Sequence, residues 1–158
     1  MPRVDHYQDP HAPAPNSLVP AASVVVVRDG KVLMHRRSDT DRWSIPGGGM
    51  EPGEFIKDTA VREAREETGY EVEIDRLVGV FSDPGHVVSY DDGEVRQQFS
   101  ICFAGHVTGG SPQLSAETRE VGWHTPDDLE AMSEDRVHPS ILLRVQVALR
   151  DETSAYIG

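Results

Sequence analysis

Hydrophobic and polar positions follow two different periods along this chain, which separates predicted strands from predicted helices. Two apolar runs, 20–28 and 31–36, flank Asp29-Gly30, a dipeptide typical of a two-residue hairpin turn. The run Val24 to Val27 is continuously apolar. Such a run is typical of a strand covered on both faces. Further strands are predicted at 71–82, 95–108 and 120–124.

Residues recur at the spacing of a helix in three segments of the chain. The first predicted helix spans 54–68, with Gly69 as the residue that ends it. A short helix over 126–132 follows Thr125, a suitable N-cap. The third spans 139–149 and carries Ile141, Leu142, Val145 and Leu149 on one side. Strands mixed with two long helices predict an α/β fold, an α/β/α sandwich around a mixed sheet.

The chain length of 158 residues suits one folded domain, which we place at 19–150. Residues 1–18 are polar and rich in proline, so we expect a mobile or extended arm there. Residues 151–158 are expected to form a frayed tail. There is no internal repeat.

The predicted helix at 54–68 carries an unusual concentration of acid. Glu63, Glu66 and Glu67 fall at i, i+3 and i+4, so their carboxylates share one side of the helix. Like charges at this spacing destabilise a helix unless a cation lies between them. Carboxylate oxygens suit Mg²⁺ or Mn²⁺. The alternative is a solvated charged face.

The segment from Gly48 to Tyr70, GGMEPGEFIKDTAVREAREETGY, resembles the signature box of the Nudix hydrolases. Seven defining positions match in register: Gly48, Glu54, Arg62, Glu63, Glu66, Glu67 and Gly69. Ala64 and Tyr70 depart slightly, at positions that are not ligands. The resemblance implies the Nudix fold and hydrolysis of a nucleoside diphosphate linked to another group, with water attacking phosphorus and a divalent metal as cofactor.

The same resemblance implies roles for individual residues. Glu66 and Glu67 are expected to be the principal metal ligands, and Glu63 a further ligand or the residue that orients the water. Gly47 is expected to offer a carbonyl ligand. Arg62 is expected to brace a carboxylate, and Glu54 to support the junction between loop and helix or to bind metal through water.

The general base is expected outside the box. Glu120, three residues before Trp123, is the first choice and Glu117 the second. Either residue could instead be an ordinary loop carboxylate.

Basic residues cluster shortly before the box. Arg36, Arg37 and Arg42 are candidates for binding the phosphates of the substrate. A salt-bridged surface with Asp39 and Asp41 is the alternative. His35, His86 and His124 could line a pocket, but no histidine or cysteine spacing suggests zinc.

A net charge of −12 argues against nucleic acid as a partner, whereas a small phosphorylated molecule remains compatible because bound metal reverses the local field. The single cysteine, Cys102, lies in an apolar run and is predicted to be a buried strand thiol. No apolar run is long enough to span a membrane, and no secretory signal is recognised. We therefore expect a cytoplasmic protein.

Specificity is open at this stage. An ADP-ribose-like nucleotide sugar is the leading substrate, partly because Pro84 lies near a proline of relatives that cleave ADP-ribose; nucleoside triphosphates are the alternative. A non-catalytic Nudix module would be expected to lose box carboxylates, and an isoprenoid diphosphate isomerase would need a catalytic cysteine. Relatives are often homodimers, and the arm could serve in pairing.

Overall fold

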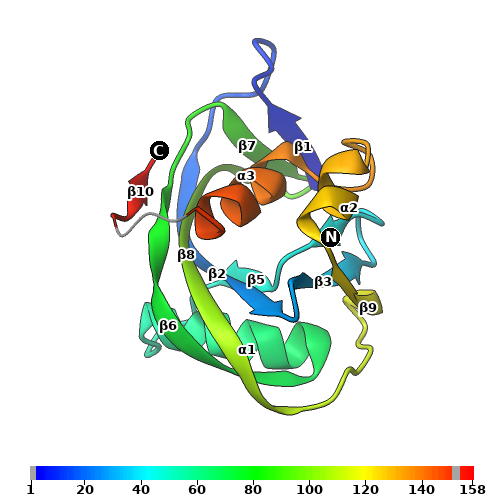
Figure 1. Cartoon of the computed structure of the whole chain (residues 1–158). Coiled ribbons are helices and arrows are strands. Elements are labelled where there is room, and N and C mark those ends of the chain that lie inside the picture. The colour runs from blue at the N-terminus through cyan, green and yellow to red at the C-terminus, as the bar shows by residue number, and fades with distance from the viewer. Residues whose placement is uncertain (1–2, 151–153) are drawn as a thin grey trace.

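A computed structural model of the chain describes residues 3–150 and 154–158. Figure 1 shows strands curled around the interior, with helices on both sides. The strands are β1 (Arg3–Tyr7), β2 (Ser17–Arg28), β3 (Lys31–Arg37), β4 (Trp43–Ser44), β5 (Gly47–Gly49), β6 (Tyr70–Phe81), β7 (His86–Tyr90), β8 (Val95–Gly110), β9 (Thr118–His124) and β10 (Tyr156–Ile157). The helices are α1 (Ile56–Thr68), α2 (Pro126–Ala131) and α3 (Pro139–Ala148).

The sheet is mixed, as predicted. β2 runs parallel to β8 over ten residue pairs that end at Val26 and Gly105. β8 is antiparallel to β6, and β3 is antiparallel to β9. The predicted hairpin between β2 and β3 is confirmed, and its turn residues Asp29 and Gly30 have φ of 52° and 74°. Positive φ at both positions is what the favoured two-residue turn requires.

The run of valines separates two hydrophobic cores. Val24 and Val26 pack in the core that includes Ala60 and Ala64 of α1. Val25 packs in the other core, with Val145 of α3. Successive side chains of a strand point to opposite faces, so both faces of β2 are covered. The predicted α/β/α sandwich is confirmed, and α1 and α3 are its outer layers (Figure 1).

Helix α1 is held in place at its C-terminal end. Gly69 adopts φ 82° in the left-handed region, and its N–H donates to the carbonyl oxygen of Arg65. A side chain at Gly69 would collide with the backbone of Ser111, so glycine is needed for both conformation and space. Helix α2 has the predicted N-cap, since the Thr125 side chain accepts from the Asp128 N–H at 3.1 Å.

The two ends of the chain differ from the expected arm and tail. Residues 3–7 form β1, which pairs with β7 from Arg3–Tyr90 to Tyr7–His86. The expected boundary at 18 falls inside β2, and within the expected tail β10 pairs with β6, while 151–153 lie outside the described residues. Short edge strands need backbone pairing but little apolar sequence, which is why the polar ends gave no strand signal.

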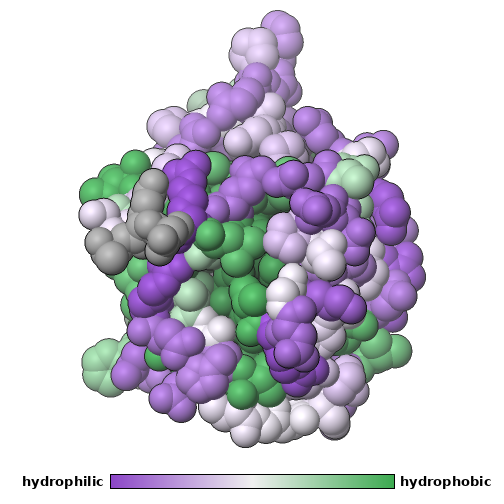
Figure 2. All heavy atoms as spheres, in the orientation of Figure 1, coloured by the Kyte–Doolittle hydropathy of each residue, from purple (hydrophilic) through white to green (hydrophobic). Residues whose placement is uncertain are grey.

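The face around α3 combines apolar and polar surface. Figure 2 shows apolar side chains over the middle of this face, within a hydrophilic rim. Cys102 is fully buried beneath it, as predicted. Among residues 3–150 and 154–158, no helix is both long and apolar enough to cross a bilayer.

Candidate active site

Three carboxylates meet where α1 approaches the start of β9. Glu63, Glu67 and Glu117 each offer one oxygen, and these oxygens lie within 4.8 Å of one another. We call these three residues the carboxylate cluster. Ala60 and Ala64 are fully buried against the sheet and anchor α1, and this anchoring holds the adjacent carboxylates in place.

Glu67 is the most buried member, with 4% of its surface exposed. Its Oε1 accepts the Gly47 N–H at 2.8 Å, and its Oε2 lies 3.4 Å from His35 Nε2. Burial raises the pKa of Glu67 well above its usual value, and the nearby Glu63 carboxylate adds to the rise although the Gly47 N–H opposes it. A cation bound beside such a buried acid stabilises the ionised form of its carboxylate.

His35 supports Glu67 from β3. The ring is buried, and its Nδ1 lies 3.2 Å from the Thr118 hydroxyl. Burial lowers the pKa of His35 to about 4, and the Arg37 guanidinium adds to this effect. The imidazole is therefore neutral at pH 7, and its buried Nε2 has no hydrogen-bond partner in the described chain.

Arg62 connects the loop before α1 to the helix. Its Nε and Nη2 donate to both oxygens of Glu54, at 2.7 and 3.0 Å, and Nη1 donates to Glu63 at 2.9 Å. Nη2 also reaches the Gly49 carbonyl at 3.0 Å. The hydrogen bond from Arg62 holds the pKa of Glu54 at about 2. These contacts place Arg62 between Glu54 and Glu63, where one guanidinium orients both carboxylates.

The glycine loop lies directly against the cluster. A Cβ added to Gly48 would lie 2.5 Å from Glu63 Oε1, and one added to Gly47 would meet the Ala22 carbonyl oxygen at 2.7 Å. Only glycine therefore lets this backbone approach the carboxylates. These features suit a hard divalent cation. The donors are oxygens, the charge of Glu67 is only partly compensated, and the backbone lies close to the carboxylates.

Two expected site residues are not members of the cluster, although Glu66 shares the Arg62 guanidinium with Glu63. Glu66 is 55% exposed at its side chain and accepts from Arg62 at 3.2 Å. Glu120 faces Arg36 across β9 and β3, and the two side chains pair at 3.2 Å. Of the two candidates for the general base, Glu117, just before β9, lies in the cluster and Glu120 does not.

A cavity of about 500 Å³ extends from the cluster over the α3 side of the sheet. Arg37 and Arg42 line it, whereas Arg36 points to Asp41 and Glu120 outside it. Arg37 donates to both oxygens of Asp39, at 2.8 and 2.7 Å. Arg37 and Arg42 thus line the cavity, whereas Arg37 and Arg36 form the salt bridges with Asp39 and Asp41 that were the alternative.

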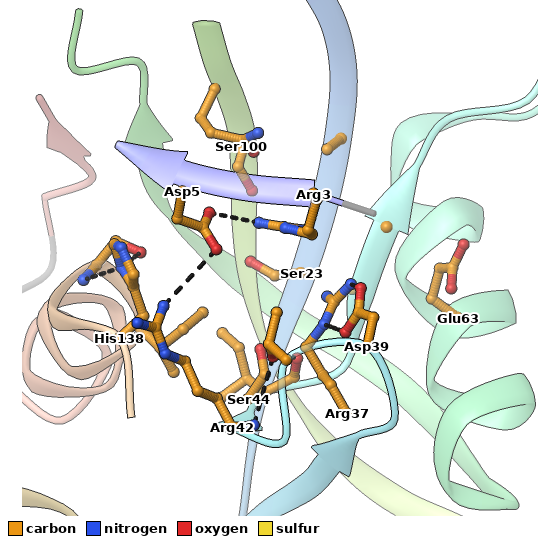
Figure 3. Close-up of a pocket in the computed structure, with 18 of the residues that line it drawn as sticks. Arg3, Asp5, Ser23, Arg37, Asp39, Arg42, Ser44, Glu63, Ser100 and His138 are labelled. Atoms are coloured by element: carbon orange, nitrogen blue, oxygen red, sulfur yellow. Dashed lines mark hydrogen bonds and ion pairs between the residues drawn. The ribbon is translucent and has the colours of Figure 1, made fainter. Parts of the chain in front are cut away.

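The far end of the cavity is built by residues that the sequence did not single out as a site. Figure 3 shows Glu63 at one side of the cavity and His138 at the opposite side, with Arg3 and Asp5 of β1 spanning between them. Asp5 accepts from Arg3 at 2.7 Å and lies 3.7 Å from His86 and from Arg42. Burial favours the neutral acid, but His86 and Arg3 outweigh it and hold the pKa of Asp5 below its usual range.

Some signals for these residues were present in the sequence. Ser23 of β2 and Ser100 of β8 are buried polar residues that each stand among apolar neighbours, and both line the cavity. His35 and His86 line it as well, whereas His124 does not. Arg3 and Asp5 gave no signal, because nothing in residues 1–18 indicated that β1 would pair with β7.

A mixed sheet between helices, with three clustered carboxylates at the end of a polar cavity, is an arrangement typical of a hydrolase. The NUDIX domain model matches residues 17–144, and the chain belongs to this family of hydrolases. Nudix hydrolases generally use a divalent metal and act on small nucleotide substrates. The resemblance found in the sequence is confirmed.

Relatives and solved structures agree with this assignment. A "MutT-like protein" of Streptomyces ambofaciens is 37% identical over 117 residues, which is 73% of this chain and 70% of the relative. An "ADP-ribose pyrophosphatase" of Methanocaldococcus jannaschii is 30% identical over 128 residues, 75% of this chain and 69% of the relative. A Nudix hydrolase structure from Nitrosomonas europaea shares the fold, with a TM-score of 0.71, 21% identity and coverage of 84% and 88% of the two chains.

Proposed function

We propose that this Nudix hydrolase cleaves the pyrophosphate bond of a nucleoside diphosphate derivative, with Mg²⁺ or Mn²⁺ as its metal. The carboxylate cluster at one end of the cavity carries this proposal, because three carboxylate oxygens lie within 4.8 Å and one of the acids is almost fully buried. Such an arrangement is costly without a cation and suited to one.

Glu63 and Glu67 would hold the metal, and Glu66 and the Gly47 carbonyl remain predicted ligands. When bound, the ion neutralises charge on the phosphoryl oxygens and acidifies a water molecule. Arg62 keeps Glu63 oriented by its hydrogen bond at 2.9 Å. The Gly47 N–H fixes one oxygen of Glu67, so the other oxygen stays directed between His35 and the cluster.

Glu117 is assigned as the general base, because it is the exposed member of the cluster and can reach a water molecule there. The oxygen of the attacking water bonds to phosphorus, and the bridging P–O bond breaks with its electron pair on the leaving phosphate. Glu117 takes the proton of the water. The products are two phosphorylated fragments and one proton, so atoms and charge balance.

ADP-ribose or a similar nucleotide sugar is the proposed substrate. A relative named as an ADP-ribose pyrophosphatase supports this choice. Pro84, the residue that first suggested ADP-ribose, lies at a second cavity that adjoins the first. A nucleoside triphosphate is the second candidate, and the relative named as a MutT-like protein supports it.

The test is a panel of ADP-ribose, a nucleotide sugar, a dinucleoside polyphosphate and nucleoside triphosphates, each with Mg²⁺, Mn²⁺ or EDTA. Phosphate is measured after a coupled phosphatase, and chromatography identifies the fragments. We expect metal-dependent cleavage of ADP-ribose, lowered more than about 100-fold by Glu67→Gln, beyond the effect typical of outer-shell changes. Glu130→Gln, an exposed acid on α2, is the matched control. Binding of these compounds without turnover by the wild type would instead identify a non-catalytic module.

A further inference from the structure

Helix α3 carries an arginine on the side that packs against the sheet. Arg144 lies within the apolar sequence ILLRVQVA and is only 7% exposed. Burial lowers the pKa of Arg144, but a guanidinium this basic stays charged at neutral pH. A fully charged side chain is therefore enclosed between α3 and the sheet.

Within residues 3–150 and 154–158, the guanidinium of Arg144 has no ion pair and no hydrogen bond, and its buried Nε is among the unpartnered atoms. The nearest compensation is the ring of Phe81, whose centroid lies 5.3 Å from Cζ of Arg144. An aromatic face offsets only part of the cost of a buried cation. The other arginines of the cavity differ, since Arg3, Arg37 and Arg96 each pair with a carboxylate at 2.7–2.8 Å.

Arg144 lies at the boundary between two cavities. It lines the cavity that begins at the carboxylate cluster and also a second cavity of about 310 Å³. Both cavities are also lined by His86, Gln98 and Ser140. Besides Arg144, the buried His86 Nε2 and Ser23 hydroxyl have no hydrogen-bond partner in the described residues. The cavity therefore carries several buried polar groups without partners, with Ser23 beside the glycine loop and Arg144 and His86 at its other end.

The charge distribution selects an anion for this end. Apart from the carboxylate cluster, the first cavity is lined by five arginines and two aspartates. Each aspartate is engaged, Asp39 with Arg37 and Asp5 with Arg3. Away from the cluster, arginines therefore outnumber acidic residues in the cavity lining, although the whole chain has a net charge of −12.

A metal ion fits this end poorly, although Asp5, His86 and His138 offer ligand atoms within 4.8 Å of one another. The Asp5 carboxylate already accepts from Arg3, and His138 Nδ1 accepts the Ser140 N–H at 3.1 Å. The neutral His138 ring then carries its proton on Nε2, so this nitrogen is a hydrogen-bond donor. A dication here would lie against guanidinium groups, whereas an anion would gain from them.

We propose that Arg144 is the receptor for a phosphate group of the substrate that lies away from the bond being cut. This inference rests on the proposed function and narrows it to substrates with a further phosphate, such as the nucleoside triphosphate that is the second candidate, because both phosphates of ADP-ribose belong to the bond that is cut. A guanidinium presents parallel N–H donors that match two phosphate oxygens. Two sources supply this group: the terminal phosphate of a nucleoside triphosphate, or a phosphate on the ribose.

Binding is measured by calorimetry in EDTA, so that neither metal nor turnover is required. Two matched pairs separate the sources: adenosine 3′,5′-bisphosphate against AMP, and ATP against ADP. We expect the wild type to prefer the more phosphorylated member of one pair by about 30-fold, and Arg144→Met to remove most of that preference while binding the other member nearly as before. The pair that shows the preference identifies the source. Absence of a preference in both pairs overturns the inference.

Arg144→Met also has a distinguishing effect on stability. Replacing an unpaired buried charge with an apolar side chain of similar length should raise the Tm of the ligand-free protein. A lowered Tm with an unchanged preference would show a merely structural arginine and overturn the inference.

Arg144→Lys keeps the charge but loses the paired donors, so it should retain only part of the preference; full retention also overturns the inference. Arg150→Met, at an exposed arginine just beyond α3, is the matched control and should change nothing.

The outcomes separate this inference from the proposed function. A binding preference that depends on Arg144, together with no hydrolysis of any diphosphate, would support the receptor and refute the enzyme activity. Metal-dependent hydrolysis without the preference would refute the receptor alone.

Discussion

Helices α1 and α3 cover opposite faces of one sheet, and each holds a buried charged group that the surrounding protein compensates incompletely. On α1 the group is Glu67, which has one backbone N–H and a neutral imidazole beside it. On α3 it is Arg144, which faces only an aromatic ring. A bound cation would compensate the charge of the first group, and a bound anion that of the second. A ligand that brings a metal and phosphate groups together would satisfy both ends of one cavity.

The two helices also differ in how readily their sequences indicated a functional role. The acids of α1 belong to a spaced motif of seven defining residues, so the motif predicted the helix, its end at Gly69 and its metal-binding role together. Arg144 is one cation in an apolar helix, and no spacing rule assigns it a partner. Function carried by a motif is readable from sequence, whereas function carried by a single buried charge depends on the structure around it.

The largest expected effect tests which acid completes the α1 site. Glu117→Gln should lower kcat by about 100-fold, because a positioned general base contributes roughly 10²–10⁴-fold. Glu120→Gln should change kcat less than about twofold, since Glu120 pairs with Arg36 outside the cavity. Steady-state rates at saturating Mg²⁺ measure both. A larger loss in the Glu120 variant would return the base to the residue that the sequence first favoured.

The second effect concerns the stability of the α1 end. Because the pKa of Glu67 is raised on folding, the native state binds more protons than the unfolded state above about pH 4.5, and stability falls as pH rises. In EDTA at pH 8, Glu67→Gln should therefore raise Tm by about 5 °C, and the gain should vanish toward pH 4.5.

Millimolar Mg²⁺ should reverse this order at pH 8. The wild type gains stability from binding the ion to its native state, and the variant gains less. Scanning calorimetry with and without Mg²⁺ measures both comparisons. If the two proteins had the same Tm in EDTA at every pH, Glu67 could not carry the uncompensated charge assigned to it.

The fold was predictable where local chemistry decides it. The hairpin at Asp29-Gly30, the valine run covered on both faces and the cap at Thr125 each depend on neighbouring residues, and each is confirmed. Strands β1 and β10 were not predicted, because they pair with β7 and β6, which lie far away in the chain. Strand β7 forms a local hairpin with β8 and was also missed, so a short half-polar strand can escape prediction even where its partner is near.

The smallest effect concerns the α3 end, where His138 begins the helix. Burial lowers the pKa of His138 to about 4, and the neighbouring His86 ring and the Arg42 and Arg3 guanidinium groups act in the same direction, against Asp5. The folded state therefore binds fewer protons than the unfolded state between pH 4 and 6.5. Stability must fall as pH decreases through this window.

His138→Asn isolates that contribution, because asparagine can still cap the Ser140 N–H but does not titrate in this range. Between pH 6.5 and 4.5, the wild type should lose about 3 °C more in Tm than the variant, while the two should differ little above pH 7. Thermal unfolding in EDTA removes the metal from the comparison. His35 shares the same window and is present in both proteins, so its effect cancels. Parallel pH profiles would mean that His138 takes up a proton in the folded protein, and that the α3 end accommodates more positive charge than its arginines already supply.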